Sequence, residues 1–533
     1  MVSIVKIVRV ESGILEGVAN ADGTVHAFQG IPYAAPPVGK LRWRPPQPVP
    51  AWSGTRKADR FGPRCVQHAR AAGSIHNFGP EPESEDCLYL NVWTGAPAPD
   101  ARLPVLVWIH GGAFYQGSGA LPVFNGGNLA RRGAVIVTVN YRLGRLGFLA
   151  HPELTRESPP ATSGNYGWLD QIAALRWVQR NIAAFGGDPD CVTLMGQSVG
   201  SGCVSAFMAS PYCKGLFQRA IGQSGASLGV GGRAGGTSMA FLDAAEQAGL
   251  KFMHALGAGS IDDLRQRSAD EIQLSRPEIG WKVVRVLDPS QIGVEGRELA
   301  WPIIDGQILS ETPRDLFLHG AQNDVPLITG ANEDEDSLMF PLADSLEAFI
   351  ARAHREYGDH ADDFLRLYAA RDDDEARRMG RAARGDETFV SQNWIWAGMQ
   401  ARTGRGKAYH YRFRRVPNMP DRARLGAFHG AEIPYVFRNF QVRSWGWDDW
   451  DRQLSDLMSS YWLNFARTGD PNGAGLPSWT AFHPENDATM IFGDRAAVAP
   501  VPERARLAFW RAHCLRDLPS AKRAEVLSAP APS

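Results

Sequence analysis

The stretch VTLMGQSVGSG, residues 192–202, constrains the fold of this 533-residue chain more than any other segment. A β-branched apolar run enters it and an alanine-rich, helix-compatible run leaves it, so it predicts a strand passing into a helix through G-x-S-x-G. Such a turn is sharp and strained, and it lifts the Ser198 hydroxyl above the sheet, beside the N–H groups that open the helix. Gly196 and Gly200 flank the serine because a Cβ would clash where strand and helix cross.

Other apolar, β-branched runs indicate central strands that are covered on both faces. We expect strands at 105–110, 135–141, 192–195, 219–222, 325–330 and 407–413. Helical spacing is clearest over 168–185, which ends at two glycines, and a late helix is expected at 454–465. The alternation predicts an α/β fold with a large, mostly parallel, doubly wound sheet whose reactive site lies at the carboxyl ends of the strands.

The domain organisation follows from what surrounds these runs. We expect one domain over residues 1–515, with helical insertions at about 230–325 and 340–400 and a small β-hairpin near the N-terminus. Residues 516–533 read as a C-terminal tail.

Composition excludes several classes of partner. The chain has 56 Lys and Arg against 57 Asp and Glu, so nothing predicts binding to nucleic acid or to an anionic membrane. No apolar run is long enough to cross a bilayer, and no membrane anchor is expected. The start lacks a signal-peptide pattern, which indicates the cytoplasm. The choice between monomer and dimer stays open.

The six cysteines lack metal-ligand spacing, and no metal or cofactor is expected. Cys65 and Cys87 both lie in polar, loop-like sequence and are candidates for a disulfide worth roughly 3 kcal/mol. Such a bridge would instead suit a periplasmic or secreted protein.

A reactive serine needs donors for an oxyanion, a base and an acid. The sequence HGGAF follows the 105–110 strand, so the N–H groups of Gly111 and Gly112 are expected to join that of Val199 in an oxyanion hole. His429 is the candidate base, since it lies in a glycine-flanked loop before an apolar run, whereas His410 sits inside a strand pattern.

The candidate acids follow the strand at 325–330. Four acidic residues, 333–336, stand in a row there, and such a charge run is usually a solvated face. Position alone does not choose among Glu333, Asp334, Glu335 and Asp336.

Taken together, the motifs resemble type-B carboxylesterases, the cholinesterase-like family of α/β-hydrolases, over nearly the whole chain. The similar segments are F-x-G-I-P-Y-A (28–34), SEDCLYLNV (84–92), HGGAF, GNYGWLDQIAALRWVQRNIAAFGGDP (164–189), the serine turn, IGQSG (221–225), the N-x-D-E stretch, FHGAEIPYVF and FARTGDPNGAGLPSW. The resemblance implies an α/β-hydrolase fold and a serine esterase.

The resemblance also implies roles for particular residues. The family pattern G-x-N-x-D-E-G makes Glu335 the acid of the triad, and Ser224 matches a serine that supports the triad from behind. Cys65 and Cys87 match the family's cystine pair.

The chain departs from the family pattern at three places. The usual G-E-S-A-G here has Gln197 and Val199, and Asp336 replaces a glycine. Gln197 removes a charge beside the nucleophile, Val199 should narrow the space near the acyl carbonyl, and Asp336, if buried, should raise a pKa.

We therefore expect hydrolysis of short- to medium-chain carboxylic esters, including xenobiotic ones, through an acyl-enzyme. An amide or carbamate hydrolase, or a lipase, would use the same triad, and some cholinesterase-like proteins only bind partners. Tyr115, Trp168, Trp394 and Trp396 are candidates for lining an apolar gorge, although most large aromatic residues are core.

Overall fold

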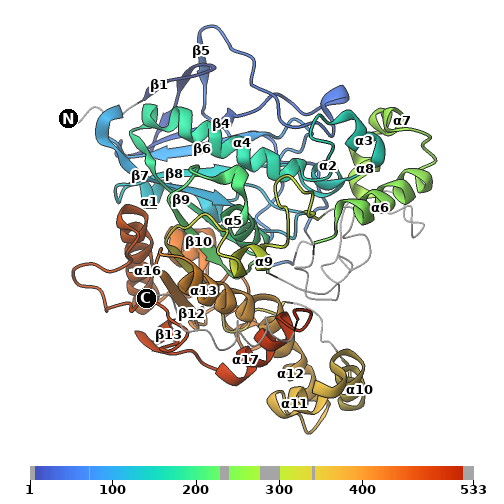
Figure 1. Ribbon diagram of the computed structural model, residues 1–533. Coiled ribbons are helices and arrows are strands. Elements are labelled where there is room, and N and C mark those ends of the chain that lie inside the picture. Colours follow the sequence, from blue (N-terminus) through green and yellow to red (C-terminus); the bar gives the residue numbers. More distant parts are fainter. Residues whose placement is uncertain (1–5, 71–72, 229–238, 276–300, 339–342, 520–533) are drawn as a thin grey trace.

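The computed structural model describes residues 6–70, 73–228, 239–275, 301–338 and 343–519, built around an eleven-stranded sheet (Figure 1). Seven neighbouring strands are parallel: β8 (Val135–Val139), β7 (Leu103–Ile109), β9 (Gly187–Gln197), β10 (Arg219–Gln223), β11 (Leu327–Asn332), β12 (Ala408–Phe413) and β13 (Ala488–Phe492). Antiparallel strands complete both edges: β14 (Ala496–Pro500) beside β13, and β6 (Tyr89–Thr94), β4 (His26–Pro32) and β3 (Val18–Ala19) beyond β8.

Alternation along the central strands sends side chains into two separate cores. On β7, Val105, Val107 and Ile109 face one core, and Leu106 and Trp108 face the other. The first core is closed by α4 (Tyr166–Asn181), α5 (Val199–Ala209) and α13 (Ser391–Thr403), and the second by α15 (Ile433–Phe437) and α16 (Asp449–Thr468). The doubly wound α/β fold is therefore confirmed.

The chain reverses its direction of winding at β7, whose two neighbours are β8 and β9. Ligand sites of open α/β sheets lie at such a switch point, outside the carboxyl ends of the strands. The serine turn follows β9 and the HGGAF segment follows β7, so both lie at this point.

The predicted strands are all present, although their bounds differ. The strand expected at 192–195 spans 187–197, because pairing with β7 and β10 extends it at both ends. The helix expected at 168–185 begins at Tyr166, and its last turn is a separate 3₁₀ turn, Ile182–Phe185, that ends at Gly186 in a left-handed conformation (φ 77°).

Smaller elements surround the sheet. The predicted hairpin is β1 (Ile7–Val10) with β2 (Gly13–Glu16), and β5 (Thr55–Lys57) pairs with β2. The insertions contain α6 (Leu242–Ala255), α7 (Ile261–Gln266), α8 (Ala269–Leu274), α9 (Pro313–Leu318), α10 (Leu346–Tyr357), α11 (Ala361–Leu367) and α12 (Asp373–Gly385). Other helices are α1 (Gly127–Ala130), α2 (Gly144–Phe148), α3 (Pro152–Glu157), α14 (Arg422–Leu425) and α17 (Arg504–Cys514).

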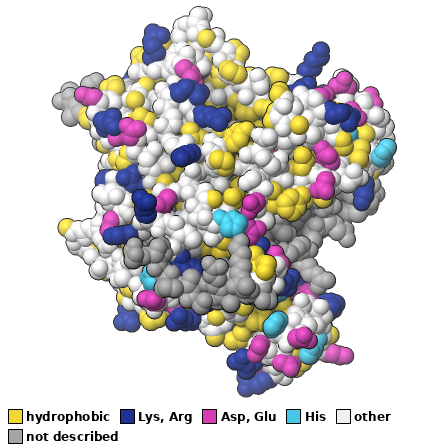
Figure 2. Space-filling model, in the orientation of Figure 1, with side chains coloured by type: hydrophobic (Ala, Val, Ile, Leu, Met, Phe, Trp, Pro, Cys, Tyr) yellow, Lys and Arg dark blue, Asp and Glu magenta, His cyan; other side chains and the backbone are white. Residues whose placement is uncertain are grey.

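The helices α10, α11 and α12 group together at the lower right of Figure 1, where they share a small core with α17. Parts of both insertions (229–238, 276–300 and 339–342) and the tail from 520 lie outside the described residues. Acidic and basic side chains are interspersed on the face shown in Figure 2. Among the described helices, none combines the length and apolarity needed to span a bilayer.

Candidate active site

Ser198 stands in a strained turn between β9 and α5, as predicted. Its backbone has φ 59° and ψ −129°, a conformation that costs a non-glycine residue energy and is typical of functional sites. Two hydrogen bonds hold the turn: Ser198 N donates to Gln223 O (2.9 Å), and Gly202 N donates to Ser198 O (3.0 Å). A Cβ on Gly200 would lie 2.1 Å from Ile109 O, so the helix passes β7 too closely for any side chain there.

The HGGAF loop follows β7 and offers free backbone donors. Within the described part of the chain, the N–H groups of Gly111, Gly112 and Val199 donate to no partner, and neither does that of Ala113. Ala113 (φ 55°) and Phe114 (φ 59°) are both left-handed, which turns the loop sharply. The Ala113 N–H is therefore a further unpaired donor in this loop, which the double-glycine signal did not indicate.

Buried contacts anchor this loop to the neighbouring β8 turn. Tyr141 stacks on His110 (4.5 Å between ring centroids), and its hydroxyl donates to His110 O (2.8 Å). Burial lowers the pKa of His110 to about 4, so this ring is neutral at physiological pH. Arg142 and Asp170 form a bidentate ion pair (2.6 and 2.7 Å) that ties the β8 turn to α4, and both side chains are buried.

Hydrogen bonds join the loop that carries Glu335 to the loop that carries His429. Asn332, the last residue of β11, donates from its side chain to Phe428 O (2.7 Å). Asp334 N donates to Ala427 O (3.1 Å), and Ala427 N donates back to the Asp334 carboxylate (2.8 Å). These bonds join the residues just before Glu335 to the residues just before His429, and Glu335 Oε2 lies 2.5 Å from His429 Nδ1.

Each of the four acidic residues has its own partner, so the expectation of a solvated charge run is wrong. Glu333 pairs with Arg412 (3.1 Å) and Asp334 clasps the histidine loop. Glu335 is buried against His429, and Asp336 is buried in an ion pair with Arg384. Burial raises the pKa of Asp336 to about 7 against the opposing effect of Arg384.

Among the described residues, no hydrogen bond joins His429 Nε2 to Ser198. The atom lies 3.0 Å from the side-chain nitrogen of Gln197, the residue before the serine. Among the described residues, Ser198 Oγ makes no hydrogen bond, and the serine is half-buried. The structure thus joins Glu335 to His429 and places Ser198 beside them on the elbow, with Gln197 on the histidine nitrogen.

A buried polar network beside Glu335 and His429 was not predicted from the sequence. The carboxylate of Glu432, three residues after His429, accepts from Gln223 Nε2 (3.0 Å) and Asn332 Nδ2 (2.6 Å). Asn332 N also donates to Glu335 Oε1 (2.6 Å), so Asn332 links the two carboxylates. The only sequence signal was the position of Glu432 within FHGAEIPYVF.

Several groups set the pKa of His429. Burial lowers it, but the charge and hydrogen bond of Glu335, followed by the charges of Glu432 and Asp336, outweigh burial, and the pKa is raised above its usual value. The ring of Phe389 covers the imidazole, with 4.4 Å between ring centroids. Phe389 lies in a π-helical turn (Asp386–Val390), a distortion that is frequent at functional sites.

The structure shows the surroundings of two groups that the resemblance singled out. Ser224 is left-handed (φ 54°) and buried, but its hydroxyl has no hydrogen-bond partner among the described residues. Cys65 and Cys87 are buried free thiols and form no disulfide. A hydrogen bond from Cys65, with burial, raises the pKa of Cys87 well above its usual value.

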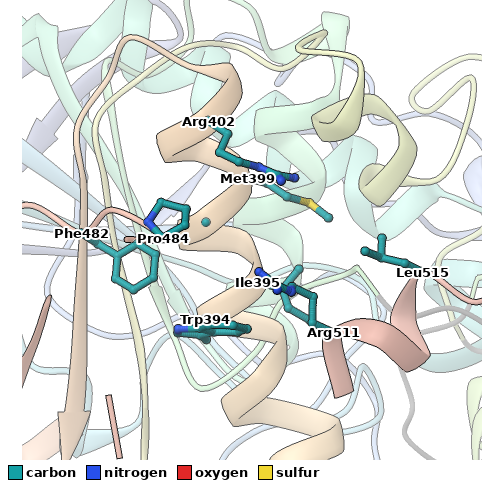
Figure 3. Close-up of a pocket in the computed structure, with 9 residues that line it drawn as sticks. Trp394, Ile395, Met399, Arg402, Phe482, Pro484, Arg511 and Leu515 are labelled. Atoms are coloured by element: carbon teal, nitrogen blue, oxygen red, sulfur yellow. The ribbon is translucent and has the colours of Figure 1, made fainter. Parts of the chain in front are cut away.

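The aromatic candidates prove to be mostly core. Trp168 and Trp396 are fully buried. Trp394 lines a pocket along α13 and α17 that contains no triad residue (Figure 3). The pocket is formed by Trp394, Ile395, Gly398, Met399, Arg402, Phe482, Pro484, Arg511 and Leu515. The described residues include no cluster of three or more His, Cys, Asp or Glu side chains that could hold a metal ion.

Comparison with known proteins gives consistent matches over nearly the whole chain. Residues 5–510 match the model of the carboxylesterase family. The chain is 38% identical to fumonisin B1 esterase of Sphingopyxis macrogoltabida (92% of this chain, 87% of the relative) and 35% identical to para-nitrobenzyl esterase of Bacillus subtilis strain 168 (93% and 97%). It is 33% identical to human cocaine esterase (94% and 89%).

Solved structures agree with this result. A thermophilic PNB esterase superimposes with a TM-score of 0.79 at 31% identity, covering 95% of this chain and all of that one. A second PNB esterase gives 0.77 at 33% identity, covering 94% and 100%.

Proposed function

This chain belongs to the carboxylesterase family and is a carboxylic ester hydrolase of small molecules, and we propose that Ser198, His429 and Glu335 carry out the reaction through an acyl-enzyme. The observation that carries this proposal is the 2.5 Å contact between Glu335 and His429 beside the strained Ser198 turn. A base oriented by a carboxylate next to a nucleophile is the arrangement that acyl transfer requires.

In the proposed first step, Glu335 holds the His429 proton on Nδ1, so Nε2 is unprotonated and carries the lone pair that accepts the serine proton. His429 takes the proton of Ser198 as Oγ attacks the ester carbonyl. The oxyanion that forms accepts hydrogen bonds from the N–H groups of the Gly111–Ala113 loop and of Val199. His429 then protonates the leaving alcohol, and water repeats the sequence to release the acid.

The resting contact between His429 and Gln197 requires His429 to exchange partners when substrate binds. Catalytic hydrogen bonds are often long or misaligned without substrate and tighten in the complex. Ser198 is half-buried, and Glu335 holds the imidazole only at Nδ1, so a rotation of the ring that turns Nε2 toward Ser198 is compatible with that exchange.

The proposed substrates are esters with short or medium acyl chains. Val199 has a branched side chain next to the serine in sequence, and the Phe389 ring covers His429, so we expect both to restrict the space around the acyl carbonyl. The relatives named for esters of fumonisin B1, para-nitrobenzyl and cocaine suggest xenobiotic substrates. The rates on p-nitrophenyl esters of increasing chain length, beside matched anilides, test this preference: kcat/KM should fall beyond medium chains and be negligible for anilides.

Ser198→Ala tests the assignment of the nucleophile. We expect kcat to fall by about 10⁶, because the members of a triad act as a unit. Ser227→Ala, a half-buried serine outside the triad, is the control and should retain activity. Near-normal activity of Ser198→Ala, or an organophosphate label on another residue, would refute the assignment.

A further inference from the structure

We propose that Gln197 is a positioning residue that holds His429 neutral in the resting enzyme and must release Nε2 before Ser198 can be deprotonated. This inference rests on the proposed function, because it concerns how the same base becomes available. It departs from the glutamate that the family resemblance leads one to expect at this position.

The contact is built into the fold. Gln197 is the last residue of β9, so the strand fixes its backbone, and its side chain is buried. Its amide nitrogen lies 3.0 Å from His429 Nε2. Its amide oxygen lies beside the oxyanion loop, where a Cβ on Gly111 would come within 3.0 Å of it. The Gln197 amide therefore lies between Gly111 and His429.

The protonation state of His429 fixes the direction of this hydrogen bond. Nδ1 is committed to the Glu335 carboxylate at 2.5 Å and carries the proton, so neutral His429 has its lone pair on Nε2. A glutamine side-chain nitrogen is a donor only. Gln197 thus occupies the lone pair that has to accept the Ser198 proton, and Ser198 Oγ has no hydrogen bond among the described residues.

A donor on Nε2 favours the neutral ring and opposes the carboxylates around it. The charged or titratable groups that face His429 are Glu335 and Asp336 after β11, Glu432 before α15, and His76 from the 73–79 loop. Three of these four are carboxylates, which favour the imidazolium. Gln197 is the side chain in contact with the ring that offers a donor to neutral Nε2.

Glutamate and glutamine differ in what they offer after proton transfer. The imidazolium carries a proton on Nε2 and needs an acceptor, which a carboxylate provides at all times. Glutamine provides an acceptor only after its amide rotates and presents its oxygen. Gln197 can therefore serve both protonation states, whereas a glutamate would favour only the charged one.

The test is the pH dependence of kcat/KM, whose acid limb reports the pKa of the base in the free enzyme. Gln197→Met keeps the side-chain length and removes the donor, so the acid limb should move up by up to about one pH unit. Gln197→Glu adds a carboxylate in contact with the ring, and we expect an upward shift of about one to three units. The pH of the acid limb should thus increase from wild type to Gln197→Met and again to Gln197→Glu.

Gln441→Glu adds the same charge at an exposed position and should leave the acid limb where it is. A purely structural role for Gln197 predicts lower kcat in both variants with no movement of the acid limb, and that result overturns the inference. If Gln197→Glu does not fold, Gln197→Met alone decides by the same criterion.

The pH dependence of organophosphate labelling of Ser198 gives a second reading of the same limb without turnover, and it should shift in parallel. If the acid limbs stay in place while Ser198→Ala is still inactive, the inference about Gln197 fails and the proposed function stands. If Ser198→Ala stays active, the proposed function fails first.

Discussion

Glu335→Gln is the substitution that most sharply separates a catalytic carboxylate from a structural one. The variant keeps the size of the side chain, and its amide oxygen can still accept from Asn332 N, which lies 2.6 Å from Glu335 Oε1. The amide nitrogen, however, would donate to His429 Nδ1. The ring proton would then move to Nε2, and the base would lose the lone pair that accepts the serine proton.

The size of the effect is bracketed in two independent ways. A carboxylate and an imidazolium with charge centres about 4 Å apart attract by about 4 kcal/mol at an effective dielectric constant near 20. That energy corresponds to a factor of about 10³ in rate. The equivalent carboxylate-to-amide change in serine proteases lowers kcat by about 10⁴ through the wrong tautomer. We therefore expect kcat of Glu335→Gln to fall by about 10³ to 10⁴.

The assay is hydrolysis of a p-nitrophenyl ester at a pH where His429 is neutral, with folding checked by circular dichroism. Glu333→Gln is the matched control, two residues earlier in the same acidic run, because its carboxylate faces Arg412 and Arg414 instead of the histidine. It should keep kcat within a few-fold. A Glu335→Gln enzyme within about tenfold of wild type, or equal losses in both variants, would refute the role of Glu335.

Three further substitutions also test the account. Asp336→Asn removes a charge that raises the pKa of His429, so the acid limb of kcat/KM should move down. Burial raises the pKa of Asp336 from 3.8 to about 7, so the stability that its protonation contributes is complete below pH 3.8 and is lost as pH rises through 7. The urea midpoint of wild type should therefore fall relative to that of Asp336→Asn over this pH range. Asp170→Asn leaves Arg142 buried with a broken ion pair and should lower the free energy of unfolding by about 3–5 kcal/mol in urea titrations. Gly112→Ala would place its Cβ 1.8 Å from Gln116 O in a left-handed backbone (φ 115°), so kcat should fall at least about 10²-fold on p-nitrophenyl esters.

The controls for these variants come from comparable sites elsewhere in the chain. Asp188→Asn breaks an ion pair with the exposed Arg102 and should cost less than about 1 kcal/mol. Gly73→Ala meets no atom within 4 Å and should leave kcat unchanged. An Asp170→Asn protein as stable as wild type, a fully active Gly112→Ala enzyme, or an Asp336→Asn acid limb that moves up would contradict the respective reasoning.

Local patterns were sufficient to predict the features that depend on neighbours in sequence. The Ser198 turn followed from the glycines that let β9 and α5 cross, and the central strands followed from their β-branched runs. The position of His429 in a glycine-flanked loop and the family resemblance for Glu335 brought together two residues that lie in contact.

Features that depend on distant segments were not predictable in this way. The prediction of a solvated acidic run was wrong because Arg412, Arg384 and the histidine loop, all distant in sequence, contact these carboxylates. Asn332 at the end of β11 links Glu335 to Glu432, because its backbone N–H donates to Glu335 and its side-chain amide donates to Glu432. No sequence pattern indicates that the Gln197 amide reaches His429.

The most direct test of the account is rapid-quench mass spectrometry during turnover of p-nitrophenyl acetate. We predict a burst of one p-nitrophenol per enzyme and the mass of one acetyl group on the peptide that contains Ser198, with the burst lost in Glu335→Gln. Turnover with no acetylated intermediate, or with the acetyl group on a residue other than Ser198, would contradict the account.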